Sequence, residues 1–261
     1  MNLQTPPLLT ERRGAVLVLT LNRPRVHNAV NRAMATAMGA ALAGVADDPG
    51  VRAVVIAAAG PGAFCSGADL KEVAAGTTPN AEGHEEWGFL GLVNHWVSQP
   101  VVAAVTGSAY AGGAELLLAC DLVVADEDAD IVYTEIEHGL FPSMGGAVRL
   151  ADHVGTKVAF EWMATGRRVS MPEARERGLV NLTVARGEVL PRALALAEVL
   201  AGHSPEAVGA FKRAFYSAVD GERTLERPRR ELNDAEWHRL RAAEAGRAGP
   251  KAFAEGRRAT W

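Results

Sequence analysis

Two glutamates have the residue type, spacing and surroundings expected of paired catalytic carboxyl groups. Glu115 follows Gly112-Gly113 at the start of an apolar run, and Glu135 lies twenty residues later, directly after Ile131-Val-Tyr-Thr. A carboxyl group in apolar surroundings is costly unless it is paired or functional. Two such groups at one site can hold a water molecule and exchange protons with it. For each glutamate alone, a capping or ion-paired role is the alternative.

Two loops of small residues are candidates for binding a developing negative charge. They are Ser66-Gly67-Ala68-Asp69-Leu70 and residues 107–113, and each follows a predicted strand and leads into a predicted helix. A helix start has free N–H groups and the positive end of the helix dipole. Each loop can therefore aim one N–H group at the same oxyanion, and the small side chains let a substrate carbonyl approach. Tight turns without a catalytic role are the alternative.

Other catalytic motifs are not supported by the sequence. In the Gly-rich segment 60–67, Cys65 replaces the third glycine of G-x-G-x-x-G and Pro61 removes an N–H group, so no dinucleotide-binding loop is predicted. No serine lies in the G-x-S-x-G motif of the α/β-hydrolases. The seven histidines have neither HExxH nor paired ligand spacing, so no metal site is predicted.

The composition is that of a globular protein rich in small residues. The chain of 261 residues has 48% hydrophobic and 6% aromatic residues, 27 glycines and a formal net charge of −4. This balance predicts neither disorder nor a nucleic-acid partner, and the apolar runs are too short to span a membrane. Two cysteines are too few for a disulfide scaffold, so we expect reduced thiols and a cytoplasmic protein. The abundance of small residues predicts chemistry that uses main-chain groups.

The elements that must position these residues alternate between strand and helix in the first half of the chain and are helical in the last third. Near-continuous apolar runs predict strands buried on both faces at residues 14–21, 52–58, 101–105, 122–125 and 130–134. Helices are expected at residues 28–46, 88–98, 115–120, 155–164, 172–177, 190–202, 205–219, 224–242 and 250–255. Ser170 and Ser204 are candidate helix N-caps.

The chain resembles the enoyl-CoA hydratase/isomerase (crotonase) superfamily over nearly its full length. The matching segments include residues 21–29, 63–72, 100–117 and 178–181. The resemblance implies an α/β crotonase fold, a spiral of ββα units followed by a helical C-terminal trimerisation region. Residues 1–195 would form the core with the CoA and acyl site, and residues 196–261 a helical region that oligomerises and covers the active site. A homotrimer, or a hexamer built as a dimer of trimers, is expected.

The resemblance also implies the roles of individual residues. The N–H groups of Ala68 and Gly112 would form the oxyanion hole for a thioester carbonyl, and Glu115 and Glu135 would be the two acids of an enoyl-CoA hydratase. The residues implied in binding CoA are Arg25, Val26, Ala29, Ala68, Asp69, Leu70, Lys71 and Gly112. CoA is part of the acyl-CoA thioester substrate, so no separate cofactor, metal ion, nucleic acid or membrane is implied.

The activity implied by the resemblance is the reversible syn addition of water to a trans-2-enoyl-CoA, which gives a 3-hydroxyacyl-CoA. Two alternatives remain open: a Δ3-Δ2-enoyl-CoA isomerase, which needs only Glu135, and a non-catalytic acyl-CoA-binding protein. Ser143 stands where several other branches of the family have Asp, which favours the hydratase branch. Ala111, in place of a glycine, and Met144 depart from the family pattern at the loop and at the acyl pocket.

Overall fold

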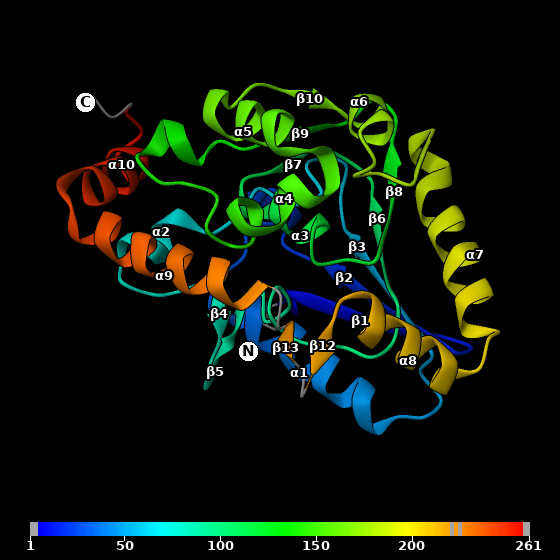
Figure 1. Cartoon of the computed structure of the whole chain (residues 1–261). Helices are drawn as coiled ribbons and strands as arrows, with labels where there is room; N and C mark the ends of the chain where they lie inside the picture. The colour runs from blue at the N-terminus through cyan, green and yellow to red at the C-terminus, as the bar shows by residue number, and fades with distance from the viewer. Residues whose placement is uncertain (1–4, 220–221, 224–225, 258–261) are drawn as a thin grey trace.

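A six-stranded sheet forms the centre of the computed structural model, which describes residues 5–219, 222–223 and 226–257 (Figure 1). Its strands, in spatial order, are β1 (Leu8–Arg13), β2 (Val16–Leu21), β3 (Ala53–Ala58), β6 (Val101–Val105), β8 (Leu122–Asp126) and β11 (Leu182–Val184). β1 and β2 pair as an antiparallel hairpin, and all the other neighbours in this sheet pair in parallel.

Helices cover both faces of this sheet, as the apolar strands predict. All five residues of β6 are buried. On one face, α7 (Val189–Ala201) lies across β2, β3, β6 and β8 and buries Val189, Ala193, Ala197 and Ala201. These residues recur at every fourth position, so small side chains line the helix face that meets the strands. On the other face, α1 (Arg32–Asp47) and α3 (Gly112–Leu117) pack into the larger core.

A second sheet, with three strands, brings the chain to both candidate glutamates. Its strands are β10 (Val169–Ser170), β9 (Asp130–Val132) and β7 (Ala109–Tyr110). β7 leads into α3, which carries Glu115, and β9 leads to η2 (Glu135–His138), a 3-10 turn that begins at Glu135. Because β7 and β9 pair in parallel, the two segments that carry the glutamates leave this sheet at the same end.

The C-terminal helices return over the core. The remaining helices are α2 (Leu70–Ala74), α4 (Gly146–Val154), α5 (Thr156–Thr165), α6 (Met171–Glu176), α8 (Pro205–Phe215), α9 (Arg227–Ala242) and α10 (Glu244–Ala254). The other short elements are η1 (Pro24–Val26), β4 (Asn80–Ala81), β5 (His84–Phe89), η3 (Arg186–Glu188), β12 (Ala218–Val219) and β13 (Glu222–Arg223). α9 contacts α4, and α10 contacts α2 and η2 (Figure 1). None of the described helices is both long and apolar enough to cross a membrane.

The structure contradicts the helix predicted at residues 88–98. The strand β5 ends at Phe89, and turns and irregular backbone follow. Gly88, Leu90 and Gly91 have φ angles of 70°, 59° and 63°, which a right-handed helix does not tolerate. The apolar residues of this segment are nevertheless buried, among them Leu90 and Val93. The pattern therefore identified core positions, but not the backbone conformation.

Several elements are not predicted by the sequence patterns, among them β1, β5, α4 and β11. The first residue of α4 is Gly146, and the residue before it is Gly145, whose φ of 122° suits glycine. Glycine is a weak helix former, so this start does not look helical in the sequence. The helix predicted at 205–219 ends at Phe215. Both predicted N-caps are confirmed: the N–H of the third residue of each helix donates to Ser170 Oγ at 3.2 Å and to Ser204 Oγ at 3.3 Å.

Candidate active site

The two loops of small residues lie directly against each other. The Tyr110 N–H donates to the Cys65 carbonyl at 2.9 Å, and Cys65 forms a parallel bridge with Ala109. Gly67 has a φ of +88°, and a Cβ added there would lie 3.2 Å from the Gly112 nitrogen. A glycine at this position therefore lets the backbones of the two loops approach each other.

Ala68 and Gly112 each have an unpartnered backbone N–H group at this junction. Neither N–H donates a hydrogen bond to a described residue. Ala68 precedes Asp69, the N-cap of α2, and Gly112 is the first residue of α3, so neither N–H has an intrahelical acceptor. Both residues line the same cavity. Two such donors can bind one oxygen that gains negative charge during a reaction.

Ala111 holds this loop in a conformation that glycine adopts more easily. Its φ is 49° and its ψ is −127°. Its N–H donates to the Val132 carbonyl at 2.8 Å, and its carbonyl accepts the N–H of Glu115 at 3.2 Å. The strained residue is thus held by β9 on one side and by the first turn of α3 on the other.

Glu115 is fully buried near the start of α3. Its Oε1 accepts the Gly146 N–H at 2.8 Å, while its Oε2 has no hydrogen-bond partner among the described residues. A Cβ added to Gly146 would lie 3.0 Å from Glu115 Oε1 and 2.7 Å from Pro142. The glycine therefore allows the carboxyl group to lie against the backbone at the start of α4.

Glu135 lines the same cavity from η2. It is 8% exposed, and neither of its carboxyl oxygens has a partner among the described residues. Burial and then the negative charge of Glu135 raise the pKa of Glu115 well above its usual range. Burial also raises the pKa of Glu135, to about 7. The pair therefore keeps a proton at neutral pH, and this proton belongs to the pair rather than to either glutamate alone.

The cavity is large and contains all the predicted binding residues. Its volume is about 1410 Å³. Its lining includes Arg25, Val26, Ala29, Ala68, Asp69, Leu70, Lys71 and Gly112, together with Met144 from the predicted acyl pocket. The Asp69 carboxylate is already engaged, because it pairs with Arg23 at 3.0 Å and accepts the Lys71 N–H at 3.2 Å. The side chains of Arg25 and Lys71 supply positive charge at this part of the wall.

One wall of the cavity comes from α9 and its N-cap, in the C-terminal region that the resemblance predicts to cover the site, although the sequence analysis names none of its residues. The residues of this wall are Glu226, Arg230, Asn233, Asp234, Trp237, His238 and Arg241. They recur every three or four positions, so they occupy one face of the helix. That periodicity is visible in the sequence, but a charged helix face is typical of a surface that faces solvent. The pattern alone therefore does not indicate a site.

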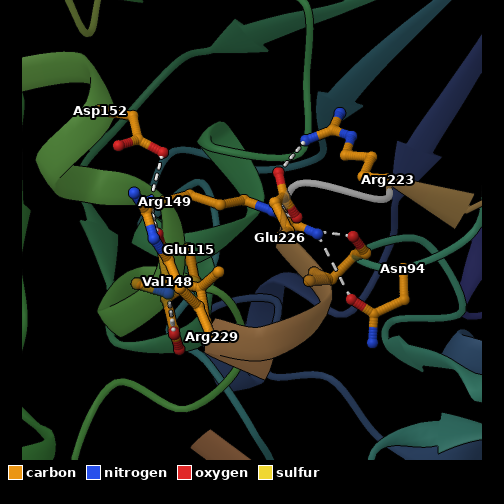
Figure 2. A network of polar contacts seen from close by, with 10 residues as sticks. Asn94, Glu115, Val148, Arg149, Asp152, Arg223, Glu226 and Arg229 are labelled. Atoms are coloured by element: carbon orange, nitrogen blue, oxygen red, sulfur yellow. Dashed lines mark hydrogen bonds and ion pairs between the residues drawn. The ribbon is translucent and has the colours of Figure 1, made fainter. Parts of the chain in front are cut away.

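A buried arginine joins α9 to the core near Glu115 (Figure 2). Arg149 in α4 is 4% exposed, its Nε lies 3.0 Å from Glu226 Oε2, and its Nη1 donates to the Val93 carbonyl at 2.8 Å. Arg223 lies 3.2 Å from the other carboxylate oxygen of Glu226. Two adjacent glycines connect these ion pairs to Glu115. Arg149 lies close to Gly145, and Glu115 lies close to Gly146.

A mostly parallel sheet covered by helices, two backbone N–H groups at one cavity without acceptors among the described residues, and a buried carboxyl pair are the features of a crotonase-type protein. The comparison with protein families agrees: the chain belongs to the enoyl-CoA hydratase/isomerase family, whose model matches residues 11–261. The fold class expected from the sequence is therefore confirmed.

Curated and solved relatives match over nearly the whole chain. The carnitinyl-CoA dehydratase of Salmonella typhi is 35% identical over 254 residues, which are 96% of this chain and 96% of that protein. The crystal structure of carnitinyl-CoA hydratase from Mycobacterium avium has a TM-score of 0.95 and 42% identity, and the match covers 99% of each chain. An enoyl-CoA hydratase/isomerase from Pseudoalteromonas atlantica has a TM-score of 0.86 and 26% identity, over 98% of this chain and 99% of that one. The relatives named here are thus hydratases and dehydratases of CoA thioesters within the family to which this chain belongs.

Proposed function

We propose that the protein catalyses the reversible addition of water to a trans-2-enoyl-CoA, with Glu115 and Glu135 as its two acid–base groups. The observation that carries the proposal is the carboxyl pair. Both groups are buried, and both have oxygens without a hydrogen-bond partner among the described residues, at a cavity that Ala68 and Gly112 also line. Unpaired buried carboxyl groups are costly to folding, which favours a catalytic use.

The Ala68 and Gly112 N–H groups would bind the thioester oxygen as it gains negative charge. Each donor of such an oxyanion hole contributes about 3–4 kcal/mol to transition-state stabilisation. Arg25 and Lys71 would attract the negatively charged CoA, since they supply positive charge on the cavity wall near this hole.

One proton on the pair is sufficient for both acid–base steps. When that proton lies on Glu115, Glu135 can remove the α-proton of a 3-hydroxyacyl-CoA while Glu115 protonates the departing hydroxyl group. In the hydration direction the roles reverse: Glu115 acts as the base toward water and Glu135 as the acid toward the α-carbon.

The acyl group is a separate part of the proposal. The relatives named for carnitinyl-CoA act on a thioester whose acyl group carries a quaternary ammonium ion, and this substrate is our first candidate. The α9 wall supports a polar acyl group, because it brings charged side chains of both signs to the cavity, among them Asp234, Arg230 and Arg241. We further propose that residues 196–261 cover the site formed by residues 1–195 and mediate assembly into a homotrimer or hexamer. Light scattering would measure the mass of this assembly.

The assay follows the absorbance of the conjugated enoyl thioester with crotonyl-CoA, longer enoyl-CoA thioesters and the CoA thioester of carnitine. We expect Glu115→Gln and Glu135→Gln each to reduce turnover about 10²–10⁴-fold, because each removes one acid–base group. Near-normal turnover in both variants would refute the two-carboxyl mechanism. Activity on 3-enoyl thioesters that survives Glu115→Gln would instead indicate the isomerase, and tight binding of every thioester without turnover a non-catalytic protein.

A further inference from the structure

Tyr133 lies between the two segments that carry the catalytic pair. It follows β9 and precedes Glu135 by two residues. Its neighbour Val132 pairs with Tyr110 and accepts the N–H of Ala111, the residue that leads into α3 and Glu115. The backbone therefore places Tyr133 beside the start of α3 as well as beside η2.

The Tyr133 hydroxyl is a buried polar group that forms no hydrogen bond with the described residues. The residue is 0% exposed and belongs to the main apolar core. Its Oη has no hydrogen-bond partner among the described residues, as is also true of Glu115 Oε2 and both carboxyl oxygens of Glu135. A hydroxyl group buried without a partner costs about 1–3 kcal/mol, and phenylalanine would fill the same volume without that cost.

The charges that act on this hydroxyl are those of the catalytic pair. Burial and the negative charges of Glu115 and Glu135 raise the pKa of Tyr133 well above its usual range, so its proton stays in place. Two other titratable side chains face this region. His138, on the same turn as Glu135, lines the cavity, and burial lowers its pKa, while Arg149 is paired with Glu226.

We propose that Tyr133 is a positioning residue for the carboxyl pair, whose O–H dipole turns toward Glu115 and Glu135 and stabilises the negative charge that the pair carries after it loses one proton. The inference rests on the proposed function, because the charge it stabilises is that of the proposed base. The hydroxyl acts through space, as a dipole in a low-dielectric interior, and it neither touches the substrate nor transfers a proton.

The test is Tyr133→Phe, which removes one oxygen and keeps the ring in the core. We expect the acid limb of the plot of kcat/KM against pH to move to higher pH by about one unit. At a given pH on that limb, such a shift lowers the ionised fraction of the pair about tenfold. KM should change little. The matched control is Tyr216→Phe, since Tyr216 faces Asp121 and does not line the cavity, and its profile should remain that of the wild type.

A readout without turnover separates this inference from the proposed function. Infrared difference spectra of the free protein across the pH range report protonation of buried carboxyl groups, and Glu115→Gln and Glu135→Gln assign the bands. An upward shift of the carboxyl titration in Tyr133→Phe supports the inference even if no thioester is turned over. An unshifted titration, with or without a change in thermal stability, overturns it and leaves the hydratase proposal intact.

Discussion

Replacing Glu135 with Gln should make stability less sensitive to a rise in pH from about 4.5 to about 7. In the folded protein burial raises the Glu135 pKa from 4.5 to about 7, so the folded state binds this proton more tightly than the unfolded state does. Well below the unfolded pKa the carboxyl group is protonated in both states and contributes no difference. As the pH rises toward 7, the unfolded state releases its proton first, and the wild-type protein loses stability.

The size of this effect follows from the pKa change. A rise from 4.5 to about 7 corresponds to about 3 kcal/mol in the free energy of unfolding, fully lost above about pH 7. Glu135→Gln removes this loss, because the amide does not ionise. Glu115 adds a loss of its own as the pH rises, because its pKa in the folded protein is also raised well above the usual value, but Glu115 is present in both proteins.

Urea denaturation of both proteins at a series of pH values between about 4 and 8 measures the effect. For each protein, the quantity compared is the change in its free energy of unfolding with pH. Any pH-independent destabilisation by the buried amide therefore cancels. Glu137→Gln is the matched control, because Glu137 is an exposed glutamate on the same turn. If the wild type and Glu135→Gln lose stability equally as the pH rises, the raised pKa of Glu135 is wrong.

Three further measurements test other parts of the structure. Gly113→Ala places a Cβ against the Cys65 carbonyl, so urea denaturation should record a loss of about 1–3 kcal/mol together with lower turnover. Glu226→Gln weakens the pairing of the buried Arg149, and we expect a loss of about 3 kcal/mol and a higher KM, because the ion pair holds α9 at the cavity. The kcat/KM for dehydration should rise with pH through about 7, as Glu135 loses its proton; a rate that is flat from about pH 5 to 8 would contradict this.

Several features of the protein are determined by the sequence alone, because they depend on short-range interactions. The apolar run at residues 101–105 forms β6 with both ends as predicted. Ser170 and Ser204 cap their helices because a capping hydrogen bond joins residues only three positions apart. The residue types and spacing of the two glutamates, together with the matching segments, were also sufficient to indicate the family.

Only the tertiary structure decided how these parts meet. Residues 88–98 have helical spacing, yet Gly91 packs so closely on the backbone of α1 that a Cβ there would lie 2.6 Å from the Ala35 carbonyl oxygen, and this packing prevails over local preference. The α9 wall and the placement of Tyr133 beside the start of α3 likewise arise from segments distant in sequence. Helix propensity and capping act within a few residues, whereas the meeting of N–H groups and the desolvation of a carboxyl group depend on long-range contacts.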